Sequence, residues 1–333
     1  MSRAMSGAEA LRVEDLRVYY PLRRTLGEVL LRRQRFLRAV DGVTLSIPEG
    51  TTLALVGESG SGKTTVARAV VGLVKPTGGR VLLWGRDVSA LSDRELKEVR
   101  RAVQMVFQDP SVSLNPRMRV GDQVKYPLDV NRIGTPEERR SMALEALRTV
   151  GLTPPEEFYS RYPHQLSGGQ RQRVAIARAI VLKPRLLIAD EPISNIDVSA
   201  RAQILELLKG LREKMGLSML YITHDLSSAW VIADTVAVMY LGKLVEHGPV
   251  EEVFSNPHHP YTKALLQAVP SLDRREAGSE VVRLKGEIPD PLNMPSGCRL
   301  HPRCPLATEK CMREEPPAVK AGENHWVYCH LYA

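Results

Sequence analysis

The hydrophobic positions of this chain fall into two alternating kinds of segment. Short, nearly continuous apolar runs are followed by longer stretches in which apolar residues recur with helical spacing. This alternation predicts an α/β fold around a parallel sheet that is buried on both faces. The expected strands are Leu53–Val56, Leu186–Ala189 and Met219–Thr223, and the expected helices are Thr64–Val74 and Ala200–Lys214.

Two changes in local amino-acid composition divide the chain. Residues 109–183 are rich in helix formers, which predicts a helical subdomain inserted into the α/β core. From about residue 249, prolines accumulate in NPHHPY, IPDPLNMPSG and EEPP, which indicates a turn-rich tail. We therefore expect a main domain at residues 1–248, with its helical subdomain at about 109–183, and a smaller C-terminal domain at 249–333.

Composition narrows the class of protein. With 43% hydrophobic and 25% charged residues, the chain has the make-up of a globular protein. It contains no apolar run long enough to span a membrane, and the N-terminus lacks the apolar segment of a signal peptide, so we expect a cytoplasmic location. The net charge of +8 is concentrated in the insert Pro21–Val40, which contains six arginines and a single acid, Glu28. Because the charge is local, it is weak support for nucleic-acid binding.

The strongest motif is GESGSGKT at Gly57–Thr64, between an apolar strand and a helix-forming stretch. It matches the phosphate-binding loop G-x-x-x-x-G-K-[ST], in which backbone N–H groups surround phosphate oxygens. The lysine neutralises phosphate charge, and the hydroxyl after it is a ligand for Mg²⁺. The residues predicted to bind nucleotide here are Gly57, Ser59, Gly60, Ser61, Gly62, Lys63, Thr64 and Thr65.

Two further segments carry candidate chemistry. LLIADE ends an apolar strand on the carboxylates Asp190 and Glu191, at the sheet edge where ligands of open α/β sheets collect. LSGGQ opens a helix with Ser167 as its expected N-cap, so it is either a simple capped helix or a second anion-binding helix N-terminus. Two phosphate sites in one chain are explained if the nucleotide is held between two subunits.

The order and spacing of these motifs resemble an ABC ATPase, the nucleotide-binding subunit of ABC transporters. The resemblance implies a P-loop ABC ATPase core, with a parallel-sheet RecA-like subdomain and the inserted helical subdomain, and the cofactors ATP and Mg²⁺. It implies that Thr64, Gln108 and Asp190 hold Mg²⁺, with Gln108 in the Q-loop. It also implies that Glu191 and His224 act on the attacking water and the γ-phosphate. The resemblance further implies that the nucleotide bound to the partner subunit is contacted by Ser167, Gly168, Gly169, Gln170 and Asp197.

Some positions match this family less closely. Tyr20 aligns with the aromatic residue that stacks on adenine, although Tyr19 is adjacent and Phe36 is near in sequence. The D-loop of the family is more often S-A-L-D than the SNID that contains Asp197, and Ile193 stands where threonine is usual. The essential carboxylates are nevertheless all present.

Segments outside the common core resemble the ATPases of oligopeptide/dipeptide importers, notably SLNPRMRVGDQV, NPHHPYTKALLQAVPSL and the cysteine-bearing tail. This implies partnership with a paralogous ATPase as a heterodimer, two transmembrane permeases and an extracytoplasmic solute-binding protein, at the cytoplasmic face of the membrane. An importer of oligosaccharides or metal complexes is an alternative. A nucleic-acid ATPase is disfavoured because neither a coiled-coil insertion nor a second ATPase core is present, so no nucleic-acid partner is expected.

All four cysteines lie in the tail, with the spacing C-x5-C-x6-C-x17-C. The spacing alone is a weak signal. In a reducing compartment, four clustered thiols suit a metal site better than disulfides. The importer resemblance implies a [4Fe-4S] cluster; Zn²⁺, with His301, His325 or His330 replacing thiols, and free buried thiols are the alternatives. The four cysteines are Cys298, Cys304, Cys311 and Cys329.

Overall fold

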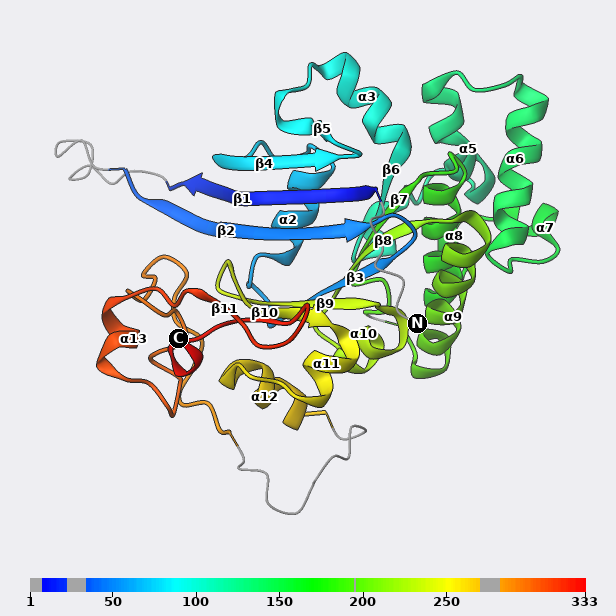
Figure 1. Cartoon of the computed structure of the whole chain (residues 1–333). Coiled ribbons are helices and arrows are strands. Elements are labelled where there is room, and N and C mark those ends of the chain that lie inside the picture. The colour runs from blue at the N-terminus through cyan, green and yellow to red at the C-terminus, as the bar shows by residue number, and fades with distance from the viewer. Residues whose placement is uncertain (1–7, 23–33, 195, 270–281) are drawn as a thin grey trace. The chain divides into compact units, whose positions relative to one another are not determined.

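The computed structural model describes residues 8–22, 34–194, 196–269 and 282–333 (Figure 1). Most of the basic insert, residues 23–33, lies outside the described residues. The chain forms two compact units, each considered by itself. Unit 1 comprises residues 8–10, 47–51, 91–194 and 196–222, and unit 2 comprises residues 11–22, 34–46, 52–90, 223–269 and 282–333.

Unit 1 contains a parallel sheet in the order β6, β7, β8. Its central strand β7 (Leu186–Asp190) is buried along its whole length, as is β8 (Ser218–Thr223), while β6 (Val103–Val106) is buried at its two ends. Continuous burial explains why these segments are apolar runs and not alternating patterns. The two strands predicted in this region are therefore confirmed within one residue at each end.

The helices of unit 1 begin at recognisable caps. The side chains of Thr135 and Ser92 each accept a hydrogen bond from the backbone N–H of the glutamate three residues later. The side chain of that glutamate in turn accepts from the backbone N–H of the cap residue. Three of the helices, α5, α6 and α8, pack against one another. The described helices are α3 (Asp93–Ala102), α4 (Pro110–Ser113), α5 (Val120–Asn131), α6 (Pro136–Thr149), α7 (Pro155–Ser160), α8 (Gly168–Ile180) and α9 (Val198–Met215), with a 3-10 turn at Pro163–Gln165.

Unit 2 contains an antiparallel sheet in the order β2-β1-β4-β5, which the hydrophobic spacing does not predict. Along β1 (Glu9–Pro21), Leu11, Val13, Leu16 and Val18 are buried, with a register shift between Glu14 and Arg17. This near-alternation is typical of a sheet with one buried face. The other strands are β2 (Phe36–Pro48), β4 (Gly78–Leu83) and β5 (Arg86–Asp87).

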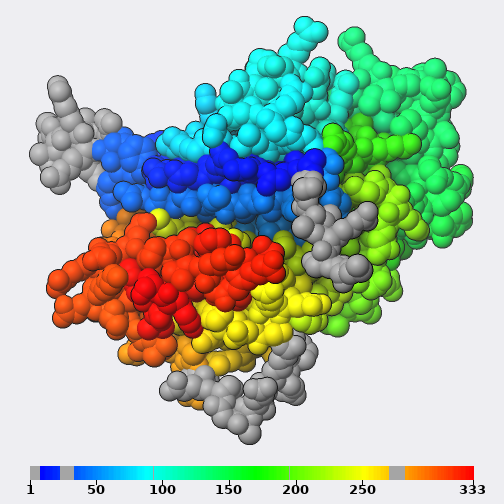
Figure 2. Space-filling model, viewed as in Figure 1, coloured from blue at the N-terminus to red at the C-terminus, as the bar shows by residue number. Residues whose placement is uncertain are grey.

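A second group of strands in unit 2 combines core and tail. Strand β3 (Thr52–Val56) pairs in parallel with β9 (Thr235–Tyr240), which pairs antiparallel with β10 (Lys243–Pro249). The tail strand β12 (Trp326–Tyr328) adds to β10 with Glu246 opposite Val327, and β11 (Ala318–Lys320) follows β12. In Figure 2 the tail, in orange and red, lies directly beside β1 and β2, in blue.

The helices of unit 2 are short. α2 begins at Lys63, one residue before the predicted start. It ends at Val70, four residues before the predicted end at Val74, because Gly72 follows with a φ of 66°. The described helices are α2 (Lys63–Val70), α10 (Leu226–Ile232), α11 (Val250–Ser255), α12 (Pro260–Gln267) and α13 (Glu309–Arg313), with 3-10 turns at Val88–Ala90 and His330–Tyr332. No described helix is long and apolar enough to cross a membrane.

Candidate nucleotide site and cysteine cavity

The phosphate-loop candidate runs from the end of β3 to the start of α2, as its motif predicts. Gly57 and Gly62 have φ values of 151° and 104°, which favour glycine. A Cβ atom at Gly57 would lie 2.2 Å from the carbonyl oxygen of Met239, and one at Gly62 would lie 2.2 Å from that of Ala39. Only glycine therefore lets the loop fold this tightly against its neighbours.

Lys63 occupies the inside of this loop. Its Nζ donates to the carbonyl oxygens of Gly57 at 2.7 Å and Glu58 at 2.9 Å, and lies 3.3 Å from Ser61 Oγ. The side chain is buried at the N-terminus of α2, where the helix dipole adds positive potential. Ser59 and Gly60 are exposed, and Thr64 is half-buried. A buried cation and a helix N-terminus at an accessible loop suit an anionic ligand.

The two candidate adenine-stacking tyrosines end β1 in different environments. Tyr19 donates its hydroxyl to Asp41, and the guanidinium of Arg38 lies 5.7 Å from its ring centre. Burial and the bond to Asp41 raise the pKa of Tyr19. Tyr20 is half-buried, and successive strand residues point to opposite faces. The hydroxyl of Tyr19 thus has a partner in the fold, and Tyr20 remains the candidate for stacking.

His224 directly follows β8 and its side chain is exposed. The next residue, Asp225, caps α10 by accepting from the N–H of Ser227. His224 thus stands at a strand-to-helix turn, the position expected from its sequence context.

In unit 1, two predicted catalytic residues are brought together. Nε2 of Gln108 donates to Oε2 of Glu191 at 2.8 Å. Asp190, the last residue of β7, is buried, whereas Glu191 is half-buried and has a φ of 46°. Ser194 holds this turn, because its Oγ donates to the carbonyl oxygen of Glu191 at 2.9 Å. The carboxylate of Glu191 therefore has a fixed direction and a polar neighbour that can orient a water molecule.

The LSGGQ segment forms the N-terminus of α8. Ser167 Oγ accepts from the N–H of Gln170 at 3.3 Å, and Gln170 Oε1 accepts from the N–H of Ser167 at 3.0 Å, which confirms the predicted cap. A Cβ atom at Gly169 would lie 3.1 Å from Cβ of Ala200 in α9. Asp197, the exposed N-cap residue of α9, is thus near the start of α8. The capping hydrogen bonds therefore fix the backbone of the segment at the start of α8.

The candidate residues are divided between the two units. Unit 2 contains the phosphate loop, Tyr20 and His224, and unit 1 contains Gln108, Asp190, Glu191, Asp197 and the LSGGQ segment. In unit 1, residues far apart in sequence converge, as the contacts of Gln108 with Glu191 and of Gly169 with Ala200 show.

The four cysteines line one cavity of about 10 Å³ in unit 2, together with His259, His301 and His330. A volume of this size accepts about one water molecule. The backbone joins two of the cysteines, because the N–H of Cys298 donates to the carbonyl oxygen of Cys311 at 2.8 Å. Across the described parts of the chain, no three His, Cys, Asp or Glu side chains lie close enough to hold a metal ion.

Burial shapes the chemistry of these thiols. It raises the pKa of Cys298 to about 11 and also raises the pKa values of Cys304 and Cys329. The thiols therefore favour the neutral form, and binding of a metal would have to drive the protons off.

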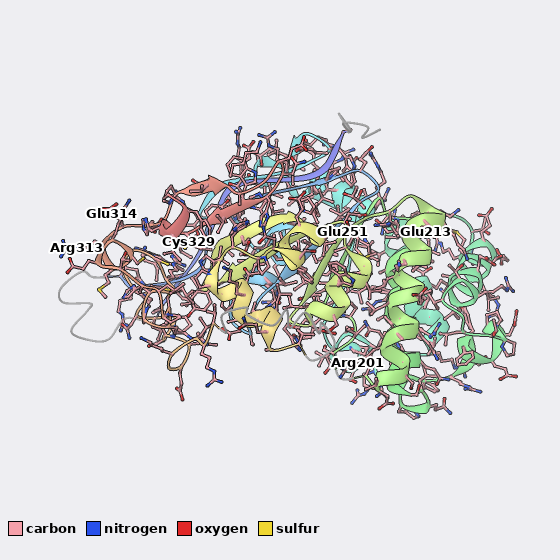
Figure 3. All side chains as sticks on the ribbon, turned by 60° about the horizontal axis from the view of Figure 1, so that its bottom comes forward. Arg201, Glu213, Glu251, Arg313, Glu314 and Cys329 are labelled. Atoms are coloured by element: carbon pink, nitrogen blue, oxygen red, sulfur yellow. The ribbon has the colours of Figure 1, made fainter. Side chains whose placement is uncertain are left out.

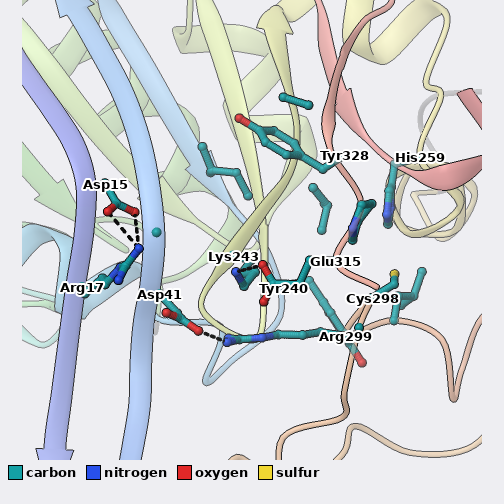
Figure 4. Close-up of a pocket in the computed structure, with 17 residues that line it drawn as sticks. Asp15, Arg17, Asp41, Tyr240, Lys243, His259, Cys298, Arg299, Glu315 and Tyr328 are labelled. Carbon is teal, nitrogen blue, oxygen red and sulfur yellow. Dashed lines mark hydrogen bonds and ion pairs between the residues drawn. The ribbon is translucent and has the colours of Figure 1, made fainter. Parts of the chain in front are cut away.

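A larger cavity of about 280 Å³ lies beside Cys298 (Figure 4). Its charged lining residues pair with one another: Arg17 with Asp15 at 2.9 Å, Lys243 with Glu315 at 2.7 Å, and Arg299 with Asp41. Arg299 also donates to the carbonyl oxygen of Leu241. Two of these ion pairs connect the tail to core strands, Arg299 to β2 and Glu315 to β10.

Sequence reasoning missed the contacts between the tail and the phosphate loop. Glu58 is hydrogen-bonded to Tyr261 and Arg303 of the tail. The motif does not indicate these contacts, because Glu58 occupies one of its variable positions. The one available signal was a charged residue at a variable position of the loop, together with arginines next to Cys298 and Cys304.

Comparison with known families gives two matches. A model described as ABC transporter matches residues 40–194, and one described as Oligopeptide/dipeptide transporter, C-terminal region, matches residues 245–311.

Curated relatives align over nearly the whole chain. The oligopeptide transport ATP-binding protein AppF of Bacillus subtilis is 46% identical over 325 residues, 97% of each chain. The oligopeptide transport ATP-binding protein OppF of Salmonella typhimurium is 45% identical over 325 residues, 96% of this chain and 95% of that one.

Solved structures are similar over the core. The ATP-binding cassette MJ0796 bound to ADP and Pi is 32% identical with a TM-score of 0.63, covering 72% of this chain and 98% of that one. The cbiO1 protein from Clostridium perfringens, part of the ABC transporter complex cbiONQ, is 29% identical with a TM-score of 0.63, covering 75% and 92%.

Proposed function

The chain belongs to the ABC transporter ATP-binding subunits of the oligopeptide/dipeptide type, and from this premise we propose that it hydrolyses ATP to drive import of small peptides. The observation that carries the proposal is the match of both parts of the chain, the ATPase core and residues 245–311. The tail distinguishes this type from other ABC ATPases, and the aligned relatives named for oligopeptide transport include it. On this reading residues 1–248 are the ATPase domain and residues 249–333 the importer-type tail.

Nucleotide binding is assigned to the phosphate loop. Lys63 and the backbone of Gly60–Thr65 bind the β- and γ-phosphates, and Tyr20 stacks on adenine. Thr64, Gln108 and Asp190 offer hydroxyl, amide and carboxylate oxygens, the hard ligands that suit Mg²⁺. When bound, Mg²⁺ neutralises charge on the phosphates.

Hydrolysis is assigned to Glu191, with Gln108 and His224. The water oxygen attacks the γ-phosphorus, the bond from phosphorus to the β–γ bridging oxygen breaks, and the water proton passes to the carboxylate of Glu191. Support for this role comes from the hydrogen bond of Gln108, which holds the carboxylate and leaves the amide oxygen of Gln108 able to orient water. His224 contacts the γ-phosphate as its charge develops.

The LSGGQ segment and Asp197 are assigned to the nucleotide of a second ATPase. We take that subunit to be a paralogue, so that the working unit is a heterodimer. It docks on two transmembrane permeases at the cytoplasmic face of the membrane, and an extracytoplasmic binding protein delivers the peptide.

The test is peptide uptake by the assembled complex in proteoliposomes that contain ATP. Lys63→Ala should abolish ATP binding by this chain and strongly reduce uptake of a labelled dipeptide, whereas Lys75→Ala, at an exposed lysine, should leave both unchanged. Full ATP binding by Lys63→Ala would overturn the assigned nucleotide site. If mass spectrometry finds an oligosaccharide or a metal complex on the binding protein, the peptide assignment is wrong while the ATPase assignment stands.

We also propose that Cys298, Cys304, Cys311 and Cys329 ligate a [4Fe-4S] cluster. Four thiols lining one cavity support it, since such clusters are held by four thiolates. A cavity of about 10 Å³ is too small for four iron atoms, and among the described residues no three ligand side chains lie close enough to hold a metal ion, so the proposal requires the segments around the cysteines to rearrange on binding.

Purification without oxygen tests the cysteine site. The proposal predicts about four iron and four sulfide per chain and a brown protein, and loss of the iron in Cys329→Ser. One zinc per chain would reassign the site to Zn²⁺, and four titratable thiols without metal would reject it.

A further inference from the structure

Glu58, the second residue of the phosphate loop, is held by the tail at both its main chain and its side chain. Its backbone N–H donates to Oη of Tyr261 at 3.0 Å. Its carboxylate accepts from Nη1 of Arg303 at 3.0 Å and from Nη2 at 3.4 Å. All three residues belong to unit 2.

The surroundings make these contacts rigid. The side chain of Arg303 is 10% exposed, and its guanidinium lies 5.8 Å from the ring centre of Tyr240. The rings of Tyr240 and Tyr261 are 4.8 Å apart, and Tyr261 is fully buried. A two-pronged ion pair in such a setting is directional and only partly screened by solvent.

The negative charge of Glu58 makes its pairing with Arg303 important for ATP binding. A carboxylate within a loop that binds phosphate repels the ligand unless a cation neutralises it, and Arg303 is that cation. The loop also works through the directions of its N–H groups, so a shift of Glu58 would misalign its neighbours. The tail thus neutralises the charge of Glu58 and holds its backbone in position.

We propose that Arg303 and Tyr261 are positioning residues for the phosphate loop, acting through Glu58, so that the tail is a working part of the nucleotide site. This inference rests on the proposed function of the loop. It assigns the C-terminal segment a task in ATP binding in addition to its cysteine site, which includes the residue next to Arg303, Cys304.

A double-mutant cycle on the full chain, with ATP and Mg²⁺ as the probe, tests the coupling. Arg303→Met should raise the Kd for ATP about tenfold, and in the Glu58→Gln background the same change should alter it less than about twofold, because no carboxylate remains to neutralise. Tyr261→Phe, which removes one hydrogen-bond acceptor and keeps the ring, should raise the Kd about threefold. The assembled transporter carrying Arg303→Met should show a raised KM for ATP with kcat nearly unchanged.

Arg313→Met is the matched control, because Arg313 is an exposed tail arginine that pairs with Glu309 and projects outward near Glu314 (Figure 3). It should bind ATP like the unmodified protein. Equal weakening by Arg303→Met in both backgrounds would overturn the proposal in favour of a general structural role, as would unchanged binding in both Arg303→Met and Tyr261→Phe. Lys63→Ala, measured in parallel, separates these outcomes from failure of the loop as a nucleotide site.

Discussion

Glu191 combines an uncommon backbone conformation with a candidate catalytic carboxylate. A non-glycine residue at a φ of 46° costs on the order of 1–3 kcal/mol, which the surrounding contacts must offset. The N–H of Glu191 donates to the carbonyl oxygen of Ile222 at 2.9 Å, and Ser194 holds its carbonyl oxygen. The strain is therefore located at the residue whose direction matters most for the proposed reaction.

Replacing this carboxylate should separate hydrolysis from binding. Glu191→Gln keeps the size of the side chain but removes the proton acceptor, so ATP turnover should fall by about 10²- to 10⁴-fold. ATP binding should persist, and ATP should accumulate in a stable dimer with the partner ATPase. Turnover in the assembled transporter and ATP retention measure the two effects. Glu213→Gln, at an exposed position of α9, is the control, and normal turnover in Glu191→Gln would refute the assigned role.

Gly62 shows how close packing determines a single residue. Gly62→Ala should destabilise the protein and weaken ATP binding, because the new Cβ would lie 2.2 Å from the carbonyl oxygen of Ala39. Gly60→Ala has nothing within 4 Å of its Cβ and meets only the strain of a φ of 78°, on the order of 1 kcal/mol. Urea unfolding and ATP binding compare the two variants. Equal losses would mean that the contact with Ala39 has no effect.

At the scale of elements, helix α8 has an exposed polar N-terminus, whereas its later turns are apolar and buried. Val174, Ala177, Ile180 and Val181 are buried at the helical spacing that the sequence predicts. The exposed Ser167 caps the same helix. The segment can thus present a fixed N-terminus to another molecule because its other end is anchored in unit 1.

Removing the cap should loosen this terminus. Ser167→Ala should lower the free energy of unfolding by about 1 kcal/mol, since the N–H of Gln170 loses its acceptor. Ser167→Asn, which retains a capping oxygen, should restore most of it. Urea denaturation followed by far-UV circular dichroism makes the comparison. If alanine and asparagine behave alike, the cap does not stabilise the helix.

At the scale of the whole molecule, a buried polar group ties the tail to the core. Glu246, fully buried in β10, accepts from the N–H groups of His258 at 2.7 Å and His259 at 3.0 Å and from Nε2 of His325 at 2.8 Å. Burial alone would raise the pKa of Glu246, but these hydrogen bonds lower it. Residues from three parts of the chain therefore depend on one ionised carboxylate.

Acid should destabilise the protein through this region. Burial lowers the pKa of His247 and of His259 from 6.5 to about 4. The unfolded chain therefore takes up protons as pH falls through 6.5, whereas the folded chain resists until about pH 4. Stability is fully present above pH 6.5 and declines below it, by up to about 3 kcal/mol per histidine. Glu246 adds a further loss below its ordinary pKa of 4.5.

Urea unfolding at pH 7.5 and pH 5 checks this dependence. In the unmodified protein, Nδ1 of His259 accepts a hydrogen bond from the N–H of Tyr261 at 3.2 Å. His259→Asn supplies an acceptor that does not titrate in its place. This variant should therefore lose less stability on acidification than the unmodified protein. His164→Asn, at an exposed histidine of unit 1, should not differ from it. Identical pH dependence in His259→Asn would remove His259 from the account.

Local patterns were sufficient for some of the elements and for naming the candidate residues, but they did not predict the sheet β2-β1-β4-β5. The strands at β3, β7 and β8, the cap at Ser167 and the phosphate loop are encoded by neighbouring residues, because burial on both strand faces, helix capping and glycine-dependent turns are short-range effects. The family resemblance rests on the same segments, and the family comparison confirms it.

Tertiary structure decided how distant segments meet. Glu58 and Arg303 are 245 positions apart, and β12 adds to β10 from the far end of the tail. The left-handed φ of Glu191 likewise depends on Ser194 and Ile222 around it. No local pattern encodes such contacts, because they depend on where the folded chain returns, and that position is set by the packing of the whole of each unit.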